Sequence, residues 1–166
     1  RHQQPTDIAV LAADDAKVRV AAKQTAARVL WWSARRASPR GGAVRAGWVT
    51  VAVAGKPERI VRVADIPLLG PHNIGNVLAA ATVARAADIP TAAIARAVRA
   101  FRGVPHRLEV VGTLRGVRYV NDSAATMPDA VVAALRAFAE PIVLVCGGKD
   151  KGLDFAPLVR ALTRSH

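Results

Sequence analysis

Short apolar runs alternate along this chain with Ala-rich stretches of helical spacing. Apolar runs bounded by turn residues predict strands, and apolar residues at helical spacing after a polar cap predict helices. We therefore expect strands at 8–12, 29–33, 48–53, 58–63, 108–114, 117–120 and 141–146. We expect helices from 14 or 15 to about 27, at 73–87, at 92–101, from 126 or 128 to 138, and at 155–163. This mixture predicts an α/β protein.

Polar residues mark the ends of several of these elements. Asp14 or Asp15 is expected to cap the first helix and Thr91 the helix at 92–101, because a side-chain oxygen there accepts a bond from a free N–H of the first turn. Residues 35–42 are expected to form a polar loop. The continuous apolar run at 141–146 is typical of a buried parallel strand. We expect Cys146, at its end, to be a buried and unreactive thiol.

Four segments place small and polar residues at the edges of apolar runs. Buried polar groups cost stability unless they are hydrogen-bonded, so such clusters are usually caps, turns or binding sites. A cap needs one polar residue, whereas here Asn, Arg, Asp, Thr and Lys recur at four boundaries. These residue types can together hold a ribose, a base edge and carboxylates. The segments are Gly70-Pro71-His72-Asn73-Ile74-Gly75-Asn76, Pro105-His106-Arg107, Asn121-Asp122-Ser123-Ala124-Ala125-Thr126 and Gly147-Gly148-Lys149-Asp150-Lys151-Gly152.

In this order and spacing the four segments resemble those of the Mur ligase family, most closely its D-glutamate-adding members. The resemblance runs from about Pro5 to the end of the chain. Asp14-Asp15 resembles the family's Asn-Ala-Asp-Asp turn, with Ala12 in place of the Asn. The resemblance implies an α/β fold in two parts. Residues 1–104 would be the second half of a central ATPase-type domain, and residues 105–166 the first part of a Rossmann-like C-terminal domain, truncated here.

The resemblance assigns ATP binding to five residues, which are His72, Asn73, Asn76, Arg107 and Asp122. Asn73 and Asn76 lie three residues apart, so both project from one side of a first helical turn, whose N-terminus favours an anionic ligand. The family Asn that matches Asn76 contacts adenosine. The family Arg that matches Arg107 reaches ATP, and the matching Asp holds the ribose hydroxyls. The same residues also have explanations that involve no ligand. They could be helix caps, a surface arginine and turn-forming residues.

The resemblance assigns the incoming amino acid to Ser123, Thr126 and Lys151. The Thr that matches Thr126 binds this amino acid in the family, and Lys151 aligns with the Lys that holds the glutamate side-chain carboxylate. We favour Lys151 over Lys149 for this role. D-glutamate-adding members often carry Lys where this chain has Ala124, so one glutamate contact is expected to differ.

The reaction implied by the resemblance is ATP-dependent amide formation. The γ-phosphate would activate the carboxylate of UDP-N-acetylmuramoyl-L-alanine, and the amine of D-glutamate would then attack the acyl phosphate. The cofactors would be ATP and Mg²⁺. The chain lacks a Gly-Lys-[Ser/Thr] phosphate loop. We therefore expect this loop, the metal ligands and the catalytic residues upstream of Arg1, and no ligase activity from this chain alone.

Composition and charge leave two alternatives beside this one. An apolar fraction of 52% is sufficient for a buried core, and no apolar stretch is long enough to span a membrane. The net charge of +12 raises the possibility of a non-catalytic module that binds RNA or another anionic ligand. The basic residues are spread along elements, so solvated helix faces explain most of the excess. A different Mur ligase, or a ligase similar to folylpolyglutamate synthase, is the other alternative.

The resemblance also implies the cellular location, the oligomeric state and the binding partners of the parent enzyme. It would be a cytoplasmic bacterial enzyme, monomeric at full length and acting on small molecules. Nucleic-acid and membrane partners are not expected. No charged-then-apolar signal peptide opens the chain.

Overall fold

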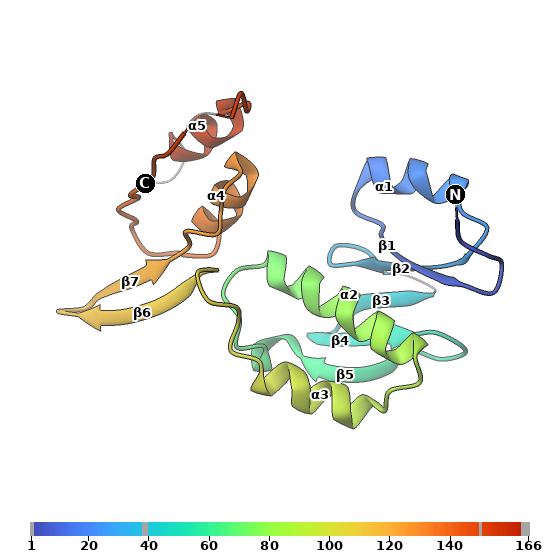
Figure 1. Cartoon of the computed structure of the whole chain (residues 1–166). Helices are drawn as coiled ribbons and strands as arrows, with labels where there is room; N and C mark the ends of the chain where they lie inside the picture. Colours follow the sequence, from blue (N-terminus) through green and yellow to red (C-terminus); the bar gives the residue numbers. More distant parts are fainter. Residues whose placement is uncertain (1, 38–39, 150, 164–166) are drawn as a thin grey trace. The chain divides into compact units, whose positions relative to one another are not determined.

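The computed structural model describes residues 2–37, 40–149 and 151–163 (Figure 1). The chain forms two compact units, and each unit consists of two separate segments of the sequence. Unit 1 comprises Arg1–Pro67 and Asn73–Phe101, and unit 2 comprises Leu68–His72 and Arg102–His166. Helices occur together with parallel and antiparallel strands, which confirms the predicted α/β class. The boundary at 104/105, and the assignment of the two parts to domains of the family, stay predictions.

Unit 1 is built on a five-stranded sheet with the order β1-β2-β3-β4-β5 (Figure 1). The first three strands run parallel to one another, and β3, β4 and β5 pair antiparallel. Helix α1 (Ala16–Ala21), continued by a 3-10 turn at Ala22–Gln24, connects β1 to β2. The four strands predicted in this region are confirmed, and a fifth forms that was not predicted. The strands are β1 (Ile8–Ala12), β2 (Arg28–Ser33), β3 (Gly41–Arg45), β4 (Trp48–Ala52) and β5 (Glu58–Arg62).

Strand β3 lies partly where the sequence predicted only a polar loop. Glycine is a poor strand former, so Gly41-Gly42 gave no strand signal. The structure shows why glycine stands there. A Cβ on Gly41 would lie 1.9 Å from the carbonyl oxygen of Trp31 in β2, and one on Gly42 would lie 2.5 Å from Oγ1 of Thr82. The two glycines therefore let β3 approach the neighbouring strand and a covering helix closely.

Two long helices follow the sheet, α2 (His72–Ala86) and α3 (Thr91–Ala100). Helix α2 contacts β3 through Leu78 and Thr82, and α3 packs against β5. Leu30, Val49 and Leu78 are fully buried between these layers. The buried Thr82 hydroxyl donates to the Leu78 carbonyl at 2.7 Å, so it enters the core without an unpaired polar group.

The helix caps agree only in part with the sequence predictions. Asp15 caps α1 as predicted, since its Oδ1 accepts from the N–H of Lys17 at 2.7 Å and of Val18 at 3.2 Å. Thr91 was wrongly predicted as a cap. It is the first residue of α3, and Pro90 is the N-cap without a side-chain bond. The first helix also ends before residue 27, because Thr25 is extended and its hydroxyl accepts from the Ala27 N–H at 3.1 Å.

Unit 2 contains an antiparallel hairpin and two short helices. Strands β6 (Glu109–Leu114) and β7 (Val117–Asn121) form the predicted hairpin, which turns at Arg115-Gly116 with both φ angles positive. Helices α4 (Pro128–Leu135) and α5 (Ala156–Leu162) pack through a small apolar cluster. The buried members of this cluster are Val132, Leu135 and Leu158.

The strand predicted at 141–146 does not form. These residues carry no regular secondary structure, and Val143 and Val145 are 94% and 92% exposed. Cys146 is exposed, so the prediction of a buried thiol was also wrong. A parallel strand exists only beside a neighbouring strand. In the described part of unit 2 the sheet consists of β6 and β7 alone, and neither pairs with this segment.

An ion pair joins the hairpin to the end of the α4 region. Arg118 Nη2 donates to Glu140 Oε1 at 2.5 Å. The backbone N–H of Glu140 and then the Arg118 guanidinium hold the pKa of the Glu140 carboxyl below its ordinary value. We expect Arg118→Gln to raise this pKa, as measured by an NMR titration of the Glu140 carboxyl carbon. Arg115→Gln, at the hairpin turn, is the matched control and should leave it unchanged.

The lowered pKa also fixes the direction of the pH dependence. A carboxyl with a folded-state pKa below the unfolded value stabilises the protein above the unfolded pKa, and this contribution is lost as the pH falls through the folded pKa. The difference in stability between the wild-type chain and Arg118→Gln should therefore shrink under acidic conditions. An unchanged Glu140 titration in Arg118→Gln would contradict the role given to this ion pair.

Candidate functional site

The predicted asparagine pair lies at the start of α2. Asn76 Nδ2 donates to Asn73 Oδ1 at 2.9 Å, which confirms that the two side chains share one side of the first turn. Gly75 lies between them, and a Cβ there would be 2.9 Å from the indole ring of Trp32. The first turn of α2 is therefore packed closely on β2. Asn76 is exposed and can meet a ligand, while Asn73 is half-buried and orients it.

His72 is the first residue of α2 and its side chain lies over the preceding turn. Gly70 has a φ of +88°, and a Cβ there would be 2.7 Å from Cε1 of His72 and 3.0 Å from Cβ of Ala137. The segment Leu68–His72 belongs to unit 2, whereas the rest of α2 belongs to unit 1. His72 thus stands where the chain passes from one unit to the other.

Arg107 and Asp122 are brought together within unit 2 by backbone hydrogen bonds. The Leu108 N–H donates to Asp122 Oδ1 at 2.9 Å, and the Ala124 N–H donates to the His106 carbonyl at 3.0 Å. Both neighbours of Arg107 are therefore tied to the segment that follows β7. The Arg107 side chain is exposed, and Asp122 is half-buried. We refer to residues 105–108 and 121–126 together as the double loop.

His106 and Asn121 add a side-chain contact to the double loop, for which the sequence suggested no role. Asn121 Nδ2 lies 2.9 Å from His106 Nδ1, and the His106 N–H donates to Glu109 Oε2 at 2.8 Å. His106 and Leu108 have positive φ angles of 65° and 46°. Such angles are uncommon outside glycine and persist where surrounding contacts fix them. The available sequence signal was that His106 and Asn121 belong to two of the four polar segments.

Ser123 and Thr126 are both exposed on the double loop. The Ser123 N–H donates to Asn121 Oδ1 at 3.1 Å, which turns the chain after β7. Thr126 does not cap the next helix, because the N-cap of α4 is Met127. Within residues 2–37, 40–149 and 151–163 the Thr126 hydroxyl has no hydrogen-bond partner. It is therefore available to a ligand, as the family resemblance implies.

Lys151 lies in the segment between 141–146 and α5, and it is exposed, as is Lys149. Asp150, between them, lies outside the described residues. Asp154 ends this segment by accepting the Ala156 N–H at 2.9 Å, which fixes the start of α5. The approach of Lys151 to Thr126, and of Asn76 to Arg107 and Asp122, stay predictions.

Asp14 has a structural role that sequence reasoning did not find. Its Oδ1 accepts from the Ser33 hydroxyl at 2.7 Å, and its Oδ2 accepts from the Ala34 N–H at 3.0 Å. Ser33 is 1% exposed, and its oxygen also accepts the Arg36 N–H at 2.8 Å. These bonds join the carboxyl ends of β1 and β2. Asp14 therefore shapes this edge of the sheet, while Asp15 caps the helix.

The described residues contain neither a cluster of metal-ligand side chains nor an apolar helix of membrane-spanning length. No group of three or more His, Cys, Asp or Glu side chains there could hold a metal ion. The described residues therefore do not fit Mg²⁺. Among the same residues, no helix combines the length and the apolar character needed to cross a bilayer.

Replacing Asp122 separates its structural role from its proposed ligand role. Asp122→Ala leaves the Leu108 N–H without its acceptor, which costs about 1–3 kcal/mol when the group stays buried. Asp122→Asn retains an oxygen for this bond and should lose much less stability. Urea denaturation followed by circular dichroism measures both. If Asp122→Ala and Asp122→Asn were equally stable, the bond to Leu108 would not hold the double loop.

Comparisons with known proteins find similar sequences. Residues 106–166 match the family described as Mur ligase, glutamate ligase domain. The chain is 42% identical over 162 residues to the UDP-N-acetylmuramoylalanine–D-glutamate ligase of Desulfitobacterium hafniense (strain Y51), covering 98% of this chain and 36% of that protein. It is 45% identical over 161 residues to the same-named ligase of Solibacter usitatus, covering 97% of this chain and 36% of that protein.

A solved structure is similar as well. MurF from Acinetobacter baumannii has a TM-score of 0.61 at 19% identity, covering 82% of this chain and 30% of the solved chain. At this identity the similarity concerns the fold alone. The chain spans about a third of the length of the curated relatives that it matches.

Proposed function

Because the chain belongs to the Mur ligase family, we propose that it is part of an ATP-dependent ligase that adds D-glutamate to UDP-N-acetylmuramoyl-L-alanine. The observation that carries the proposal is the double loop. Two hydrogen bonds donated by backbone N–H groups tie the two neighbours of Arg107 to Asp122 and Ala124, within the segment that matches the glutamate ligase domain. The family membership favours a ligase over the RNA-binding module that the net charge of +12 suggested.

The residues present would bind and orient the nucleotide. Arg107 offers a planar fork of N–H donors to phosphate or ribose oxygens. Asp122 keeps Oδ2 for ribose hydroxyls while Oδ1 holds Leu108. The exposed amide of Asn76, oriented by Asn73, would hydrogen-bond the adenosine. His72 would stand beside it at the start of α2. These residues position substrate, and phosphoryl transfer depends on further groups that stabilise its charge.

The incoming amino acid would bind through the double loop and the glycine-flanked segment before α5. The Thr126 hydroxyl and the turn at Ser123 would contact the α-amino and α-carboxylate groups of this amino acid. Lys151 would pair with its second carboxylate, which is the feature that distinguishes glutamate from neutral amino acids. Ala124 carries no charge, so Lys151 would be the main cation of this subsite. ATP and Mg²⁺ are the cofactors of the proposed reaction, which would take place in the bacterial cytoplasm.

A chimera tests the proposal. This chain would replace the matching segment of the Desulfitobacterium hafniense relative, whose remaining parts supply the rest of the enzyme. We expect phosphate release from ATP that requires both UDP-N-acetylmuramoyl-L-alanine and D-glutamate. The 166-residue chain alone should release none. A folded chimera that accepts another amino acid but not D-glutamate would overturn the substrate assignment. Ligase activity of the isolated chain would overturn the expectation that the catalytic groups come from the remaining parts of the enzyme.

A further inference from the structure

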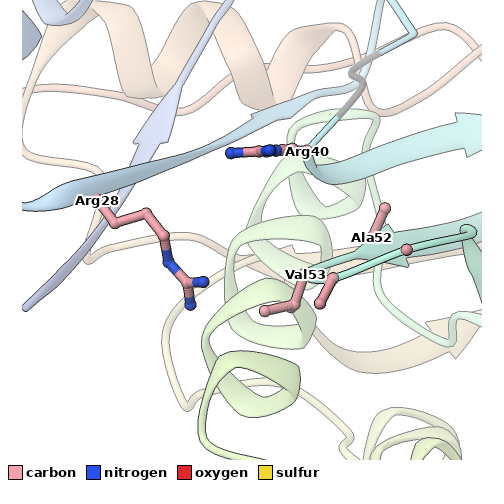
Figure 2. Close-up of a pocket in the computed structure, with 6 residues that line it drawn as sticks. Arg28, Arg40, Ala52 and Val53 are labelled. Atoms are coloured by element: carbon pink, nitrogen blue, oxygen red, sulfur yellow. The ribbon is translucent and has the colours of Figure 1, made fainter.

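A hollow in unit 1 is lined by none of the residues assigned above. It has a volume of about 400 Å³ and is lined by residues from three places in the sheet (Figure 2). Arg28 begins β2, Arg40 immediately precedes β3, and Ala52 ends β4. The remaining lining residues, Val53, Ala54 and Gly55, follow β4 toward β5.

The backbone around this hollow is fixed by the sheet. The Arg28 N–H donates to the Asp7 carbonyl at 3.0 Å, and the Arg40 carbonyl accepts from the Trp31 N–H at 3.0 Å. Ala52 is paired with Gly41 in the antiparallel ladder of β3 and β4. Both arginine side chains are thus carried by backbone that is already ordered. A ligand would therefore have to order the two side chains but not the backbone that carries them.

The hollow combines two cations with a small apolar wall. Figure 2 shows the Arg28 and Arg40 side chains extending into the hollow, with Ala52 and Val53 on another side of it. A guanidinium binds phosphate oxygens through paired N–H donors, and two of them match a doubly charged phosphate. Ala52, Val53 and Ala54 offer methyl groups to a carbon skeleton. The volume lies near the lower end of about 300–1,000 Å³ for ligand pockets, which suits a small molecule.

We propose that this hollow binds a small organic phosphate, with the phosphate between Arg28 and Arg40 and the carbon part against Ala52 and Val53. The hollow lies at the amino ends of the parallel strands β2 and β3. Asp14 and Ser33, by contrast, join the carboxyl ends of β1 and β2. None of the residues that line the hollow is assigned to the nucleotide or amino-acid sites of the proposed ligase. The proposed binding does not depend on them.

Phenyl phosphate is a suitable probe because it joins one phosphate to one apolar ring. We would titrate it, inorganic phosphate and phenol into the ¹⁵N-labelled 166-residue chain and follow backbone amide shifts. Phenyl phosphate should bind saturably, more tightly than inorganic phosphate, and shift the amides of residues 52–55. Phenol should not bind. No saturable shift at these residues, or equal affinity for phenyl phosphate and inorganic phosphate, would overturn the proposal.

Single substitutions assign the phosphate to the two arginines. Arg28→Gln and Arg40→Gln should each weaken phenyl phosphate binding about ten- to a hundredfold, the range expected for a lost hydrogen bond to a charged group. Arg96→Gln, at an exposed position of α3 in the same unit, is the control and should change nothing. Both lining variants remove a surface charge, and their amide spectra report whether the fold is retained. Equal losses of phenyl phosphate binding in all three variants would show that overall charge causes the effect, and the proposed site would be rejected.

Discussion

Lys151→Ala, introduced into the chimera described above, is expected to raise the KM for D-glutamate about ten- to a hundredfold and to leave the KM for ATP nearly unchanged. Lys151 is an exposed cation near the start of α5, and the proposed substrate carries a second carboxylate. A hydrogen bond to a charged group contributes roughly 1.5–3 kcal/mol, which corresponds to this range. Steady-state kinetics with each substrate varied in turn separates the two constants.

Two companion variants make this result specific. Lys149→Ala removes an equally exposed cation two residues away and should leave glutamate kinetics unchanged. Ala124→Lys should be tolerated, because D-glutamate-adding members of the family often carry Lys there. If Lys151→Ala instead abolished ATP binding and spared glutamate, this segment would serve the nucleotide. The amino-acid assignment would then fail.

Gly41→Ala is expected to destabilise unit 1 by about 3 kcal/mol or more. Two effects add at this position. The φ of +115° is one that residues with a Cβ rarely adopt, which costs about 1–3 kcal/mol. The new Cβ would also lie 1.9 Å from the Trp31 carbonyl oxygen, and overpacking of this kind costs typically 1–3 kcal/mol. The strands β2 and β3 would have to separate to admit it. Urea denaturation of the 166-residue chain measures the loss.

A second glycine provides the control for Gly41→Ala. Gly47 also has a positive φ, +76°, but a Cβ there meets nothing within 4 Å. Gly47→Ala therefore tests the backbone term without the clash and should cost only about 1 kcal/mol. Equal losses for the two variants would show that the approach of β3 to Trp31 contributes nothing.

Local patterns were sufficient for elements that find their partners nearby. The β4–β5 and β6–β7 hairpins have apolar runs on both sides of a short turn, and both form as predicted. The run at 141–146 has an equally strong apolar pattern. It forms no strand, because strand formation depends on a neighbour rather than on the run itself. Strand β3 is the opposite case, since its glycines are explained only by contacts with Trp31 and Thr82.

The candidate site was predictable where spacing alone defines geometry. Three residues of helix place Asn73 and Asn76 side by side, and their hydrogen bond follows. The double loop was not predictable in this way. Its links between His106 and Ala124, and between Leu108 and Asp122, depend on positive φ angles at His106 and Leu108 that these residue types do not indicate. Sequence reasoning could name Arg107 and Asp122 but could not derive what holds them together.

The segment Leu68–His72 belongs to unit 2, although the sequence on both sides of it belongs to unit 1. This has a consequence for the order in which the protein folds during synthesis. Gly70 packs close to Ala137, which is translated much later. At about 5–20 residues per second, several seconds of translation separate the two. The sheet of unit 1 and the body of α2 can therefore assemble on the ribosome while the segment before His72 still waits for its neighbours. The turn at Leu68–His72, just before the candidate nucleotide-binding asparagines, gains its contact with Ala137 only after that residue has emerged.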